Sequence, residues 1–174
     1  MIQEIRKEFF AYRNGVVADQ LRSAGDPHKM IMGCQLADLI AITSHYEKDA
    51  ALAQALWDDF QSRECGMAAT MLYPVEEFAM KTALAWCQSV ESAEIADVLC
   101  HRLLRHLNYA PALWERLREI DQPLVRYTAY RLLLNLLLMN RIEKTADLRS
   151  IVQKELKRAE LFMRPLLLSI EEEL

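Results

Sequence analysis

The stretch PLVRYTAYRLLLNLLLMN, residues 123–140, decides the fold class. Proline suits the first turn of a helix, where its missing N–H has no partner to lose. The apolar residues that follow would lie on every side of a helix, which is typical of a buried helix. The longest apolar run, at 132–139, is too short to cross a bilayer, and Arg131 and Arg141 flank it. We therefore expect a central helix surrounded by other elements.

The rest of the chain is also divided into helical segments. Only 4 glycines and 5 prolines occur in 174 residues, and no run of β-branched residues alternates as in a half-buried strand. Breaks such as Asn14-Gly15 and Gly25-Asp26-Pro27 end helices. The sequence thus predicts an all-α protein with helices at about 2–13, 16–24, 34–45, 49–60, 62–72, 74–88, 92–107, 111–120, 123–140, 144–158 and 160–172.

Helix length and connection length predict the architecture. Short helices with tight connections favour antiparallel neighbours, and stacked pairs of this length predict a HEAT-like α-α superhelix. The length of the chain favours one domain over residues 1–174. The amino-terminal MIQEIRKEFF is charged where a secretory signal needs apolar residues, so we expect a cytoplasmic protein.

Cysteine spacing indicates the state of the thiols. No two of the four cysteines have CxxC spacing, which favours buried free thiols over a zinc site or a redox pair. We therefore expect neither a metal nor a cofactor. The cysteines are Cys34, Cys65, Cys87 and Cys100.

Charge is unevenly distributed along the chain. Residues 1–100 hold 8 Lys or Arg against 15 Asp or Glu, whereas residues 101–164 hold 13 against 7. The formal net charge of −4 argues against a nucleic-acid partner. A basic region in an acidic protein still attracts phosphate, because electrostatic fields are screened within about 10 Å. A solvated face with interspersed glutamates is the alternative.

The segment ESAEIADVLCHRLLRH, residues 91–106, places Asp97, His101 and Arg105 at i, i+4 and i+8, on one face of the predicted helix. A carboxylate here either stabilises a developing cation, as in glycoside chemistry, or belongs to a solvated ladder of charges. The pattern leaves both alternatives open.

Two further segments carry a family resemblance. MGCQLADLIAIT (32–43) and ALAQALWDDFQSRECGMAATML (51–72) together resemble the front half of the AlkD-like DNA alkylation repair glycosylases, and the resemblance extends over about residues 30–130. The matching positions are Gly33, Leu36, Leu39, Trp57, Glu64, Ala68 and Ala69.

The resemblance implies a superhelix of HEAT-like helix pairs whose basic concave face binds DNA and whose chemistry removes positively charged alkylated purines. It places Asp97 at the aspartate that stabilises positive charge on the sugar, and Arg126 near an arginine that holds a backbone phosphate. The chain departs from the family at Ser92 and Ala93, where a tryptophan is expected, and its carboxyl-terminal segment has no tryptophan either.

Three functions follow as hypotheses: an alkylpurine DNA glycosylase with Asp97 as its catalytic residue, a non-catalytic DNA binder, and a HEAT-repeat scaffold for another protein. The expected partners are the backbone of double-stranded DNA or another protein, with no membrane. Arg126 has the alternative of pairing with an internal carboxylate. Tyr127 and Tyr130 are candidates to replace the missing aromatic wall. The expected DNA-binding residues are Arg126, Arg131, Arg102 and Arg105.

Overall fold

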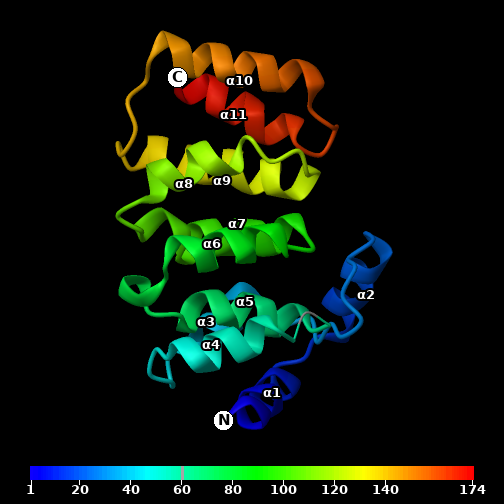
Figure 1. Cartoon of the computed structure of the whole chain (residues 1–174). Coiled ribbons are helices and arrows are strands. Elements are labelled where there is room, and N and C mark those ends of the chain that lie inside the picture. The colour runs from blue at the N-terminus through cyan, green and yellow to red at the C-terminus, as the bar shows by residue number, and fades with distance from the viewer. Residues whose placement is uncertain (60) are drawn as a thin grey trace. The chain divides into compact units, whose positions relative to one another are not determined.

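The computed structural model describes residues 1–59 and 61–174, and within them it forms eleven α-helices and two short 3-10 helices (Figure 1). The all-α prediction is therefore confirmed, whereas the HEAT-like superhelix stays a prediction. The chain divides into two compact units, residues 1–79 and 80–174, and the expected single domain over 1–174 also stays a prediction.

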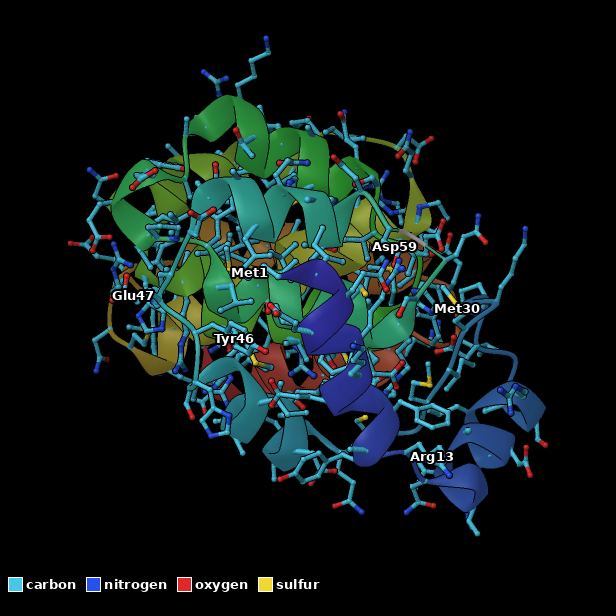
Figure 2. All side chains as sticks on the ribbon, turned by 90° about the horizontal axis from the view of Figure 1, so that it is seen from below. Met1, Arg13, Met30, Tyr46, Glu47 and Asp59 are labelled. Atoms are coloured by element: carbon cyan, nitrogen blue, oxygen red, sulfur yellow. The ribbon has the colours of Figure 1, made fainter. Side chains whose placement is uncertain are left out.

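The first unit is built around α5. Helix α5 packs on α3 and α4, and α1 packs on the same two helices. Side-chain contacts flank α1: the Tyr46 hydroxyl donates to Glu8, and Arg6 pairs with Asp59 (Figure 2). The helices are α1 (Ile2–Ala11), α2 (Gly15–Ser23), α3 (Leu36–Thr43), α4 (Ala50–Trp57), α5 (Arg63–Leu72) and the 3-10 helix η1 (Val75–Glu77).

A buried carboxylate connects the two segments that carry the family resemblance. Glu64 on α5 accepts hydrogen bonds from the backbone amides of Met32 (3.1 Å) and Gly33 (3.0 Å), and Arg63 pairs with it at 2.8 Å. Gly33 has a φ of +78°, and a Cβ there would lie 2.1 Å from the carbonyl oxygen of Asn14. Glycine and glutamate at these positions are thus explained by the fold of this loop.

The second unit is built around α9, as the sequence predicts. Twelve of its 16 residues are buried, and it packs against α6, α7, α8 and α11, while α10 packs on α11 (Figure 1). Within the described ranges, no helix combines the length and apolar character needed to cross a bilayer. The helices are α6 (Met80–Gln88), α7 (Ala93–Arg102), η2 (Leu104–His106), α8 (Ala110–Leu117), α9 (Pro123–Leu138), α10 (Ala146–Arg158) and α11 (Arg164–Glu173).

Three predicted helices differ from the observed ones by four or more residues at one end. The helix expected at 74–88 begins only at Met80, because Phe78 leaves the helical conformation to pack edge-on against Tyr73, with ring centroids 4.6 Å apart. The helix expected at 92–107 ends at Arg102, and the one expected at 160–172 begins at Arg164 after a turn. Residue 60, the expected end of the helix at 49–60, lies outside the described residues. The predicted buried free thiols are confirmed for all four cysteines.

Candidate active site

Asp97 takes its partners from α9 rather than from its own helix. Arg131 donates from Nε to Asp97 Oδ1 at 2.5 Å and from Nη2 to Asp97 Oδ2 at 2.8 Å. This two-point fork holds the carboxylate in one plane. The side chains are 35 % (Asp97) and 30 % (Arg131) exposed, so the pair remains open to a ligand. Arg131 on α9 therefore orients this carboxylate. The charge-ladder alternative, in which Asp97 pairs with His101 on the same helix, does not.

Tyr127 completes the contacts of Asp97. It lies one helical turn before Arg131, and its hydroxyl donates to Asp97 Oδ1 at 2.8 Å. Burial and the neighbouring charge of Asp97 raise the pKa of Tyr127 to about 12, so the phenol keeps its proton at neutral pH. The hydrogen bond to Asp97 raises the pKa of Arg131, which therefore stays cationic. Two positioned donors thus hold one carboxylate.

A partly open cavity of about 220 Å³ lies beside this cluster. Phe162, from the turn before α11, stacks on Tyr127 with ring centroids 5.7 Å apart and an interplanar angle of 31°. The two rings give the cavity an aromatic lining. Its lining residues are Tyr127, Arg131, Leu134, Phe162, Pro165, Leu166 and Ser169.

The aromatic lining comes from a tyrosine and a phenylalanine: Tyr127 lies on α9, and Phe162 lies in the carboxyl-terminal segment in which the family resemblance expects a tryptophan. Ser92, next to the expected tryptophan position, caps α7 by accepting a hydrogen bond from the amide of Ile95 at 3.2 Å. Tyr127 was among the expected replacements. Phe162 was not singled out from the sequence, although it is the one aromatic residue in the carboxyl-terminal segment 159–174. That single aromatic residue was the available signal, but the sequence places it inside a predicted helix at 160–172.

Basic side chains follow Asp97 along α7 and η2. His101, Arg102, Arg105 and His106 come within nine residues of Asp97. Burial first, and then the charges of Arg105 and Arg102, lower the pKa of His101, so its imidazole is neutral at pH 7. Within the described part of the chain, neither Arg102 nor Arg105 forms an ion pair. This group therefore gives the surface near Asp97 a positive potential.

Arg126 lies in a different environment. Its guanidinium donates to Asp121 at 2.7 Å and to both carboxylate oxygens of Glu160 at 2.9 and 2.7 Å, and its Nε lies 3.2 Å from Glu155. The side chain is 8 % exposed. Of the two alternatives for this arginine, the structure has the pairing with carboxylates, of which Glu155 is buried whereas Asp121 and Glu160 are 86 % and 41 % exposed. The arginine brought next to Asp97 is Arg131, and a phosphate-binding role for Arg126 stays a prediction.

Comparison with known proteins gave one match. The family model described as DNA alkylation repair enzyme matches residues 5–165. Searches of curated proteins and of solved structures returned no match. The matched range includes Asp97, Arg131, Tyr127 and Phe162.

Proposed function

Because the chain belongs to the DNA alkylation repair enzyme family, we propose that it binds double-stranded DNA and releases positively charged alkylated purines as a glycosylase. The observation that carries this proposal is the fork between Asp97 and Arg131, held by Tyr127, with Arg131 and Tyr127 lining an aromatic cavity. We propose a HEAT-like superhelix as the framework that presents these residues to DNA.

The charges of the fork are complementary to a nucleotide that is losing its base. As the bond from sugar to base breaks, positive charge develops on the sugar, next to a negative backbone phosphate. Asp97 supplies the negative charge for the sugar, and Arg131 supplies the positive charge for the phosphate. Arg131 uses Nε and Nη2 for Asp97, which leaves Nη1 for the phosphate. Tyr127 keeps the carboxylate oriented, so little reorganisation is needed during the reaction.

The aromatic rings suit the proposed leaving group. An alkylated purine of this class is flat and positively charged, and both properties favour contact with the face of an aromatic ring. Tyr127 and Phe162 present such rings beside Arg131. The basic side chains that follow Asp97 would contact neighbouring phosphates and give sequence-independent affinity.

A titration of short duplexes tests this proposal. Native protein is titrated into a duplex with one alkylated purine and into the unmodified duplex, at about 50 mM and about 200 mM salt, and free base is measured in parallel. We expect binding that weakens steeply with salt, preference for the modified duplex, and base release. Salt-dependent binding without release would indicate a non-catalytic DNA binder. Absence of binding at the lower salt concentration would refute the proposal and favour the scaffold for another protein.

A further inference from the structure

The basic residues Arg105 and His106 lie on η2, a short element with few backbone hydrogen bonds of its own. Before it, Leu103 leaves the helical conformation of α7, with φ −127° and ψ −62°. The amide of His106 donates to the carbonyl of Leu103 at 3.1 Å, and the amide of Leu107 donates to that of Leu104 at 3.1 Å. Hydrogen bonds of a 3-10 turn have poorer geometry than those of an α-helix. The position of η2 therefore depends on contacts from outside the segment.

Arg141 supplies such a contact from the loop after α9. Its Nη1 donates to the carbonyl oxygen of Arg105, and its Nη2 donates to the carbonyl oxygen of Leu107 at 2.8 Å. A guanidinium is planar and its donors have fixed directions, so two bonds from its two Nη groups fix the relative positions of the two carbonyls. Arg141 thus holds the backbone in η2 and directly after it.

The end of α9 fixes the backbone of Arg141 itself. Asn140 has a φ of +53°, and its amide donates to the carbonyl of Leu137 at 3.0 Å. The amide of Arg141 donates to the carbonyl of Leu136 at 2.8 Å. These two hydrogen bonds form the Schellman motif, which ends many helices. Because α9 is the buried helix of this unit, Arg141 connects η2 to a packed element.

The same contacts change the electrostatic potential at η2. Carbonyl oxygens at the carboxyl-terminal end of a helix carry partial negative charge, which repels a phosphate. Arg141 covers two such oxygens with its cation. Nε of Arg105 donates to Nε2 of His106 at 3.2 Å, which leaves both Nη groups of Arg105 for an anion. The segment therefore presents donors rather than acceptors to a phosphate.

We propose that Arg141 is a positioning residue for DNA binding: it holds η2 so that Arg105 contacts a backbone phosphate, and it does not contact phosphate itself. The proposal rests on the proposed function and gives a role to a residue outside the cluster of Asp97 and Arg131. Phosphate oxygens accept two parallel hydrogen bonds from one guanidinium when its direction is right. A backbone that is held in advance loses less conformational entropy on binding.

Direct binding of phosphate by Arg141 is the alternative, and the salt dependence of affinity separates the two roles. A lost phosphate contact lowers the slope of log affinity against log salt by about 0.9. A lost positioning contact leaves the phosphate contacts in number, and therefore the slope, unchanged, but lowers affinity at every salt concentration. Lysine at this position keeps the charge but lacks the planar fork that bonds two carbonyls. Arg141→Lys therefore separates the charge of the side chain from its geometry.

Fluorescence anisotropy of a labelled duplex at several salt concentrations tests the positioning role. The variants are Arg141→Lys, Arg141→Gln, Arg105→Gln and the control Lys154→Gln, which removes an exposed charge on α10. We expect both Arg141 variants to lower affinity by about fivefold and to keep the slope of the native protein. We expect Arg105→Gln to lower the slope by about 0.9, and the control to match the native protein.

Amide hydrogen exchange of the free protein tests whether Arg141 holds η2. The amides to follow are those of His106 and Leu107, which form the backbone hydrogen bonds of this segment. We expect them to exchange about tenfold faster in both Arg141 variants, because local opening becomes easier. The amide of Leu133, inside α9, should exchange as in the native protein, which shows that the variants remain folded.

The outcomes separate the positioning role from the proposed function. If the native protein does not bind the duplex, both are wrong. If the native protein binds and releases base but Arg141→Lys matches it in affinity and in amide exchange, the positioning role alone is wrong. The role is also wrong if Arg141→Lys keeps native affinity while Arg141→Gln lowers the slope by about 0.9, because Arg141 is then itself a phosphate contact.

Discussion

Replacing Arg126 by glutamine should lower stability more than replacing Arg131, whereas replacing Arg131 should have the larger effect on DNA binding. Arg126 is 8 % exposed and Glu155 beside it is 2 % exposed, whereas Arg131 and Asp97 are each about one-third exposed. A buried charge that loses its partner stays unpaired and destabilises the protein. An exposed charge that loses its partner is solvated by water instead, so the loss of stability is small. The two arginines are therefore expected to act on different equilibria.

The magnitudes follow from the partners that remain. Arg126→Gln leaves Glu155 buried, but Arg158 still pairs with it at 2.6 Å, so we expect a loss of about 2–3 kcal/mol in the free energy of unfolding, below the range for a fully stranded charge. Arg131→Gln leaves Asp97 bonded to Tyr127 and open to water, so we expect a loss of about 1 kcal/mol or less.

DNA binding should show the reverse order. If Arg131 holds a phosphate, Arg131→Gln should lower the slope of log affinity against log salt by about 0.9, the value for one contact. Arg126→Gln should leave that slope unchanged. The measurements are urea unfolding and fluorescence anisotropy of a labelled duplex at several salt concentrations. The assignment is refuted if Arg126→Gln lowers the slope by about 0.9 while the free energy of unfolding is unchanged.

Three further predictions concern the fold and the site. Gly33→Ala should lower the free energy of unfolding by about 2–4 kcal/mol in a urea titration, because φ is +78° and the new Cβ would meet the Asn14 carbonyl oxygen; an unchanged midpoint would contradict the loop geometry. A thiol-specific chromogenic reagent should react slowly with all four cysteines of the native protein and rapidly after unfolding, since burial raises the pKa of each thiol; rapid reaction of a native thiol would oppose this. Asp97→Asn should lower the pKa of Tyr127 from about 12, because burial and the negative charge of Asp97 are the two causes that raise it. Burial remains, so the pKa should fall only in part; an NMR titration of the ring that shows no change would contradict the hydrogen bond.

Helix content and the position of the central helix could be predicted from the sequence because they depend on local pattern. The stretch 123–140 is apolar on all sides, and Asn14-Gly15 separates two helices as expected. The conformation of the segment after α7 could not be predicted, because it includes a contact with a distant residue: Arg141 donates to the carbonyl oxygens of Arg105 and Leu107, in and after η2. Such long-range backbone capping leaves no periodic signal.

The candidate site was predictable in part. Asp97 and Arg131 were both named from the sequence, but their pairing across 34 residues depends on how α7 packs on α9. Arg126 and Arg131 lie on the same helix among apolar residues, so the sequence did not distinguish the buried one from the open one. Phe162 was missed because its position over Tyr127 depends on the turn that Arg126 and Glu160 hold.

The central claim, that Asp97 stabilises the sugar cation, is tested most directly by a single-turnover rate of base release. Native protein, Asp97→Asn and Asp147→Asn are compared at saturating concentration on a duplex with one cationic alkylated purine. Asp147 is an exposed aspartate in the first turn of α10, so it controls for the loss of one charge. We predict that Asp97→Asn slows release by about 10²–10³-fold with duplex affinity retained, while Asp147→Asn matches the native protein. Equal release rates for all three proteins would contradict the claim.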